Sequence, residues 1–251
     1  MIGISVGLAA LLAWVFLAAT GFWLCRERDD LVGPTEPENN EAAVIARSLG
    51  SLVAQDYPGK FRILLVDDNS SDKTAAIARG LSDPRLEVID GAPLAAGWTG
   101  KLWALSQGVA AAGRPDWLWL TDADIDHAPD TLRRLIGISG SQKAELVSFM
   151  ARLHCETWPE RALVPAFVYF FMMLYPFNWI NRRGPMAGAA GGCILVRREA
   201  LEAAGGISII RDALIDDCAL GKAIKRQGPI WLGLTDRSRS IRPYRKWEEV
   251  L

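Results

Sequence analysis

The chain has 251 residues, of which 50% are hydrophobic, and its 28 Lys and Arg against 29 Asp and Glu give a formal net charge of -1. This length suits one large α/β domain or two small ones, and the balanced charge excludes the basic field that attracts nucleic acid. The four cysteines form no Cys-x-x-Cys pair, which argues against a zinc site or a disulfide framework and fits a reducing compartment.

The chain begins with an apolar, uncharged run over residues 2–24, which is about the length needed to cross a hydrocarbon core of roughly 30 Å. Arg26 and Arg28 follow at once, so the positive-inside rule puts the rest of the chain in the cytoplasm. A cleaved signal peptide is disfavoured, because a basic n-region is missing and the run is long for an h-region. We therefore predict a transmembrane anchor over residues 1–25, a polar linker over 26–39, and a single-pass protein of the cell (inner) membrane.

After the linker, helical and strand patterns alternate. Helices are expected at residues 40–53, 73–79, 100–112, 129–137, 198–204 and 211–226, and strands at 61–66, 85–89, 117–121, 145–150 and 193–196. Strands that alternate with helices imply a mostly parallel, right-handed wound sheet flanked by helices.

A second apolar segment covers residues 158–180. Pro165 and Pro176 interrupt it, and arginines lie on both sides, so a simple membrane span is not the first expectation. One interpretation is a helix that lies in the membrane interface and shapes a lipid-facing groove. The alternative is a buried core helix.

Two carboxylates follow the strand at residues 117–121 directly, in the order Thr121-Asp122-Ala123-Asp124. Side chains two apart on an extended chain point the same way, so Asp122 and Asp124 are expected to face one point. Neighbouring carboxylates repel each other, and a hard cation such as Mg²⁺, which is typically held by one or two carboxylates plus substrate phosphates, removes that repulsion. The alternative is a strand end followed by an acidic, solvated turn.

Three further groups carry candidate chemistry. Asp67 and Asp68 follow the strand at residues 61–66, where they could accept hydrogen bonds from a base or ribose or form a capped loop. Lys101 lies at a helix N-terminus that could face an anion. Asp216 and Asp217 lie in the first part of a helix, where acids also complement the helix dipole.

In this order and spacing, the four groups resemble a family 2 glycosyltransferase of the GT-A fold. The stretches Thr121-Asp122-Ala123-Asp124-Ile125-Asp126-His127-Ala128-Pro129-Asp130-Thr131-Leu132 and Gly188-Ala189-Ala190-Gly191-Gly192-Cys193-Ile194-Leu195-Val196-Arg197-Arg198 extend the likeness. With the amino-terminal anchor, the chain resembles the membrane-bound hopene-associated glycosyltransferase subgroup. The resemblance covers about residues 40–244 and implies a catalytic domain over 40–251.

The resemblance implies an inverting transfer of a sugar from a nucleotide-diphosphate donor. The predicted anchor and the second apolar segment point to a lipid or lipid-linked acceptor. Asp67 and Asp68 would hold the nucleoside, Lys101 would lie near the donor phosphates, and Asp122 and Asp124 would form the Asp-x-Asp pair. This pair would hold Mg²⁺ or Mn²⁺ on the sugar diphosphate, with Asp124 as its direct or water-mediated ligand. Asp217 would be the general base, with Asp216 beside it where the family has Glu-Asp.

The chain departs from the family pattern at both ends. Residues 31–36 stand where the family has an apolar first strand, so that strand is expected to be missing, and the chain is expected to be truncated at its C-terminus relative to the family. A catalytically impaired, membrane-tethered binding protein is therefore the alternative function. A haloacid-dehalogenase phosphatase is disfavoured, because Asp126 stands where its motif has Thr or Val, and no Gly-x-Gly-x-x-Gly supports a Rossmann dehydrogenase.

Overall fold

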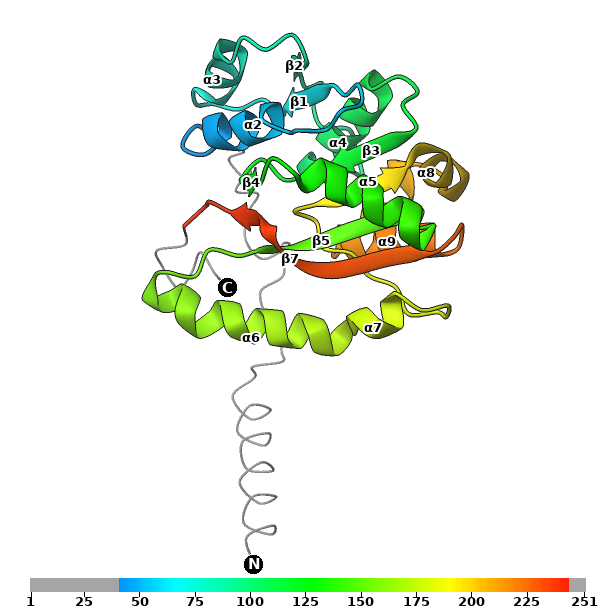
Figure 1. Ribbon diagram of the computed structural model, residues 1–251. Coiled ribbons are helices and arrows are strands. Elements are labelled where there is room, and N and C mark those ends of the chain that lie inside the picture. The colour runs from blue at the N-terminus through cyan, green and yellow to red at the C-terminus, as the bar shows by residue number, and fades with distance from the viewer. Residues whose placement is uncertain (1–40, 244–251) are drawn as a thin grey trace, which may run out of the picture. The chain divides into compact units, whose positions relative to one another are not determined.

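The computed structural model describes residues 41–243 (Figure 1), so the predicted anchor and linker and the end of the chain lie outside the described residues. The helices are α2 (Ile45–Val53), α3 (Thr74–Gly80), α4 (Gly100–Ala111), α5 (Thr131–Gln142), α6 (Trp158–Leu174), α7 (Phe177–Ile180), α8 (Arg198–Ala204), the 3-10 helix η1 (Ile207–Ile210) and α9 (Asp216–Lys225). The strands are β1 (Ile63–Asp67), β2 (Leu86–Asp90), β3 (Trp117–Leu120), β4 (Ile125–His127), β5 (Leu146–Arg152), β6 (Ile194–Arg197) and β7 (Ile230–Ser240).

These strands form two sheets. β1 and β2 pair in parallel, and the second sheet has the order β3-β6-β5-β7-β4. The expectation of a mostly parallel arrangement holds for β1–β2 and β5–β7, whereas β6 is antiparallel to β3 and β5, and β4 is antiparallel to β7. β6 runs antiparallel to β3 because it starts at the end of the sheet where β3 finishes. Gly191 comes shortly before β6 and Asp122 shortly after β3, and a Cβ on Gly191 would lie 3.7 Å from Oδ2 of Asp122.

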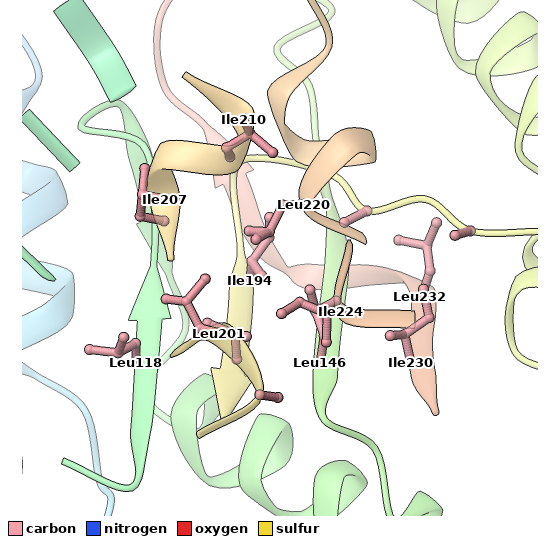
Figure 2. Close-up of a cluster of buried hydrophobic side chains, with 14 of the residues drawn as sticks. Leu118, Leu146, Ile194, Leu201, Ile207, Ile210, Leu220, Ile224, Ile230 and Leu232 are labelled. Atoms are coloured by element: carbon pink, nitrogen blue, oxygen red, sulfur yellow. The ribbon is translucent and has the colours of Figure 1, made fainter. Parts of the chain in front are cut away.

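The five-stranded sheet is buried on both faces. Leu146 and Val147 are successive residues of β5, and each is fully buried on a different face of the sheet, as a period of two requires. One face packs against α8, η1 and α9, as Figure 2 shows for Leu201, Ile210 and Leu220 around Ile194. The other face packs against α5, mainly through Leu135. This packing fixes the ends of β3 and β6 next to the start of α9.

A smaller cluster joins β1 and β2 to α2 and α3, as seen at the top of Figure 1. The apolar face predicted for the first helix is confirmed, because Ile45, Leu49 and Leu52 of α2 are buried here against Ile63 of β1. Within residues 41–243, β1 has β2 as its one partner strand and β3 has β6. Residues 31–36, where the first strand was expected to be missing, lie outside the described residues.

Several element predictions were wrong at their boundaries or incomplete, and the first helix begins at Ile45 rather than at residue 40. α5 continues past Gly137 to Gln142, because its buried face continues to Ser139, and it ends at Lys143 in the left-handed conformation with φ 51. The last predicted helix begins at Asp216 rather than at residue 211, since Ile215 has non-helical dihedral angles. β4 and β7 were not predicted, because much of β7 is polar and its pairing partners are distant in the chain.

The apolar segment at residues 158–180 forms α6 and α7. It is long and apolar enough to cross a membrane by length and composition, with a mean hydropathy of 1.5, and 6% of its most apolar window is buried. Within residues 41–243 the segment is therefore not a core helix, because a core helix is mostly buried.

Candidate functional site

One cavity of about 640 Å³ brings together every residue that the sequence proposed for the site. The residues are Asp67, Asp68, Lys101, Asp122, Asp124, Asp216 and Asp217. They come from the ends of β1 and β3 and the first turns of α4 and α9. Ligands of α/β folds bind beyond the carboxyl ends of strands, where both pairs of strand-end aspartates lie.

Lys101 links the acids of β3 to those of α9. Its Nζ lies 3.2 Å from Oδ1 of Asp122 and 3.3 Å from Oδ2 of Asp216. Desolvation works to lower the pKa of Lys101, but the two carboxylates outweigh it and hold that pKa above its ordinary value. The lysine is therefore charged at neutral pH, as a group that binds phosphate must be.

Two backbone N–H groups orient the carboxylate of Asp217. Gly191 donates to Oδ2 at 2.8 Å, and Cys218 donates to Oδ1 at 2.7 Å. Burial raises the pKa of Asp217, and the neighbouring Asp216 acts in the same direction, against these hydrogen bonds. An acid in the first turn of a helix normally has a lowered pKa, so burial makes this carboxylate more basic than its position on the helix alone would.

Gly191 is a site residue that the sequence interpretation did not assign. A Cβ at this position would lie 3.5 Å from Oδ2 of Asp217, 3.5 Å from Nζ of Lys101 and 3.7 Å from Oδ2 of Asp122. The glycine thus leaves open the space among three charged groups. The run of glycines and alanines at residues 188–192 was the signal that could have pointed to it.

The sequence predicted that Asp122 and Asp124 lie on an extended chain and face one point. The structure instead has a turn at Ala123 and Asp124. Asp122 faces Lys101, whereas Oδ2 of Asp124 accepts a hydrogen bond from Ser240 Oγ at 2.8 Å and lies 3.8 Å from Arg242 Nε. Burial raises the pKa of Asp124, and the nearby charge of Asp122 adds to the rise. The two carboxylates are therefore close neighbours with different partners.

Ser240 and Arg242 were missed because they come from β7 and the residues after it. Arg242 also forms an ion pair with Glu41, which precedes α2, and all three side chains line the cavity. Residues 201 positions apart in the chain thus close one side of the site. Their sequence context carried no signal for this contact.

A buried histidine holds the strand that carries Asp122. His127 Nε2 lies 2.8 Å from Oγ1 of Thr121, and its Nδ1 lies 2.9 Å from Oγ of Ser238 on β7. Thr121 also donates to the carbonyl of Gly192 at 3.0 Å. This network connects the end of β3 to residues 188–192, which we call the glycine loop. Burial lowers the pKa of His127 to about 4, so the ring is neutral at physiological pH.

The ends of β1 and β2 approach each other closely beside Asp67. Gly91 donates to the carbonyl of Asp67 at 2.8 Å, and a Cβ on Gly91 would lie 2.7 Å from that oxygen, which no side chain tolerates without a shift. Oδ1 of Asp67 is buried and has no hydrogen-bond partner within residues 41–243. A buried acceptor without a donor is costly, and a ligand that donates to Asp67 would satisfy it.

The carboxylates fit a divalent cation that is shared with a substrate. In the part of the chain that the structure describes, no group of three or more His, Cys, Asp or Glu could form a closed metal site. Mg²⁺ is usually bound by one or two carboxylates together with substrate phosphates. Asp122 and Asp124 supply these two carboxylates, so the residues present fit Mg²⁺ or Mn²⁺.

Comparison with known sequences agrees with this geometry. The family model described as "Glycosyl transferase family 2" matches residues 37–205. The beta-monoglucosyldiacylglycerol synthase of Synechocystis sp. is 39% identical over 100 residues, which cover 39% of this chain and 20% of that protein. The protein of the same name from Trichormus variabilis is 29% identical over 190 residues, covering 72% of this chain and 38% of the relative. The chain thus spans well under two thirds of the length of these relatives.

Solved structures share the fold at low sequence identity. The mannosyltransferase PcManGT from Pyrobaculum calidifontis, in complex with GDP-Man and Mn²⁺, matches with a TM-score of 0.63 and 22% identity over 98% of this chain and 70% of that one. The glucosyl-3-phosphoglycerate synthase from Mycobacterium tuberculosis, in complex with Mn²⁺, UDP and phosphoglyceric acid, matches with a TM-score of 0.55 and 19% identity over 84% of this chain and 69% of that one. These matches confirm the expected GT-A fold.

Proposed function

Because the chain belongs to glycosyl transferase family 2, we propose that it transfers a sugar from a nucleotide-diphosphate donor to a lipid or lipid-linked acceptor, with inversion at the anomeric carbon. The observation that carries this proposal is the convergence of four separate motifs on one cavity. Each of those motifs has an ordinary structural explanation when taken alone, but a shared cavity allows them to act together on one ligand.

Asp217 is the general base of the proposed reaction. Its carboxylate takes the proton of the acceptor hydroxyl as that oxygen bonds to the anomeric carbon and the bond to the diphosphate breaks on the opposite face. Gly191 and Cys218 orient the carboxylate through their N–H groups, and burial keeps it basic. A positioned base of this kind typically contributes about 10²–10⁴-fold to the rate.

The other acids and Lys101 hold the donor. Asp67 and Asp68 accept hydrogen bonds from the nucleoside, which satisfies the buried oxygen of Asp67. Lys101 pairs with the donor phosphates. Before the donor binds, the carboxylates of Asp122 and Asp216 keep the lysine charged. Asp122 and Asp124 would hold Mg²⁺ or Mn²⁺, which would neutralise the negative charge on the leaving diphosphate.

The acceptor is inferred from the relatives and from α6. Two relatives are beta-monoglucosyldiacylglycerol synthases by name, and a diacylglycerol is a lipid. Phe167 and Phe171 of α6 line the cavity and give its wall an apolar part. With the anchor predicted at residues 1–25, this supports a single-pass protein of the inner membrane with a cytoplasmic domain. The motif resemblance supports its placement in the hopene-associated subgroup.

A second function has one observation in its favour. Among the described residues, β1 and β3 each have a free edge, and residues of both strands line the cavity. A domain whose nucleoside wall is incomplete there would bind ligands without turnover. The alternative is therefore a catalytically impaired, membrane-tethered binding protein.

The deciding experiment measures nucleoside diphosphate release from candidate sugar donors in the presence of Mg²⁺ or Mn²⁺. We expect release by the wild type, a strong loss in Asp124→Asn and Asp217→Asn, and no loss in Asp236→Asn, a matched control at an 86% exposed carboxylate. Unchanged release in both site variants would contradict the assigned roles. A wild type that releases no nucleoside diphosphate from any donor would favour the binding protein.

A further inference from the structure

The outer face of α6 and α7 is apolar and exposed. It consists of Trp158, Tyr169, Met172, Met173, Leu174 and Trp179, whose exposed fractions range from 40% at Met172 to 81% at Trp158. Figure 1 shows the two helices end to end along the lower side of the domain. Soluble proteins rarely leave a continuous apolar surface of this kind in water, and such a surface marks an interaction site.

Buried residues lie at both ends of this helical segment, and its α7 end is hydrogen-bonded to the sheet. At the start of α6, Glu160 is fully buried, and its Oε1 lies 2.7 Å from Nδ1 of His154. At the end of α7, Ile180 is fully buried, and Asn181 exchanges two hydrogen bonds of 2.9 and 2.7 Å with the backbone of Leu232 on β7. A helical segment with buried residues at both ends and an exposed apolar side between them fits an orientation flat on a bilayer.

The charges around the outer face identify its partner. Arg161, Arg182 and Arg183 are exposed at the two ends of the segment. The one acid within α6 and α7 is Glu160, which is buried, whereas the exposed Glu156 lies two residues before α6. An apolar stripe flanked by exposed cations, with tryptophans near its ends, complements a bilayer that contains anionic lipids.

The inner side of the same helix reaches the site. Phe167 is 56% exposed and lines the cavity that contains Asp217, together with Phe171. Tyr175 packs against the glycine loop so closely that a Cβ on Gly188 would lie 2.9 Å from its Cδ1. The apolar outer face and part of the cavity lining therefore belong to the same helix.

We propose that the outer face docks α6 and α7 onto the surface of an anionic bilayer with the helix axis in the membrane plane, so that a lipid headgroup enters the cavity past Phe167 and Phe171. The docking stands on the exposed face, its two buried ends and its flanking arginines. The entry of an acceptor headgroup rests on the proposed function.

Because the predicted anchor alone would hold the full chain on vesicles, the test measures the depth of α6 rather than binding. A polarity-sensitive fluorophore is attached to the new cysteine of the full-length Met173→Cys variant. The control is Ser141→Cys, at an exposed residue of α5, labelled in the same way. The unsubstituted chain gives the background from the native cysteines. In vesicles of phosphatidylglycerol and phosphatidylcholine, we expect a blue shift and quenching by shallow spin-labelled lipids at position 173 and neither at 141. Arg182→Gln and Arg183→Gln should each lower the docked-to-undocked ratio about five-fold.

Two results would overturn the docking. Quenching at position 173 no stronger than at 141 would show that the outer face does not enter the bilayer. A blue shift at position 173 that appears without vesicles and grows with protein concentration would show that a second copy of the chain covers the face.

A separate measurement tests headgroup entry. The double variant Met173→Ser/Leu174→Ser should lower sugar transfer into vesicle-embedded acceptor at least ten-fold and leave nucleotide release in the absence of acceptor unchanged. The control Leu94→Ser, at an exposed leucine outside the cavity lining, should change neither sugar transfer nor nucleotide release. Equal transfer by the double variant and the wild type would overturn the entry route. If the proposed function itself fails, nucleotide release is absent from every variant, while the depth measurement still decides the docking.

Discussion

The neutral, buried ring of His127 predicts how the stability of this domain depends on pH. The ring is 4% exposed, and burial lowers its pKa from 6.5 to about 4. Below pH 6.5 the unfolded chain binds a proton at this position, whereas the folded protein binds it only near pH 4. The stability that comes from this histidine is therefore present above pH 6.5 and is lost as the pH falls toward 4.

The size of the loss follows from the shift. Each pKa unit corresponds to 1.36 kcal/mol, so a shift from 6.5 to about 4 amounts to about 3 kcal/mol between pH 7 and pH 4. Burial raises the pKa values of Asp124 and Asp217, and their contribution has the opposite sign, since stability from them is lost as the pH rises. The total for the wild type therefore mixes both effects.

Comparison with His127→Gln isolates the histidine. Urea unfolding in detergent micelles, followed by tryptophan fluorescence at constant ionic strength, gives the free energy of unfolding of both proteins from pH 7 to pH 4. Lost packing against Trp119 lowers the stability of the variant at every pH. The difference between the two proteins should shrink by about 3 kcal/mol across this range. A difference that stays constant within about 1 kcal/mol would refute the buried neutral ring, because a shift of less than one pKa unit would then suffice.

Three further predictions concern activity. Burial raises the pKa of Asp217, and the proposed base acts when it is deprotonated, so kcat should fall on acidification through a pKa above the ordinary aspartate value of about 3.9. In pH profiles of kcat, this acidic limb should appear in the wild type and not in Asp217→Asn. Gly191→Ala should lower kcat at least ten-fold, since its Cβ would lie 3.5 Å from Oδ2 of Asp217 and from Nζ of Lys101. Its melting temperature should stay within a few degrees of that of the wild type. An unchanged kcat would contradict the role of this open space. Lys101→Met should raise the donor KM more than Lys101→Arg does, whereas equal values would remove the lysine from phosphate binding.

The sequence by itself determined where the candidate site residues lie along the chain, and all of them line one cavity. Asp67 and Asp122 stand where apolar strands end, and Asp217 stands where a helix begins. These placements depend on the local contrast between apolar and polar residues and on helix-start signals, which a single stretch of chain contains. The anchor at residues 1–25 remains a prediction of the same kind, because it lies outside the described residues.

The tertiary structure alone decided which partner each carboxylate has. β7 was not predicted, so neither was the delivery of Ser240 and Arg242 to Asp124, which depends on strand pairing between segments more than a hundred positions apart. The basicity of Asp217 likewise comes from burial by distant elements rather than from its place on α9. The composition of the 158–180 segment fitted a span, a core helix or a surface helix, and its attachment at Glu160 and Ile180 left its apolar side exposed. In each case the deciding contact joins residues that only the folded chain brings together.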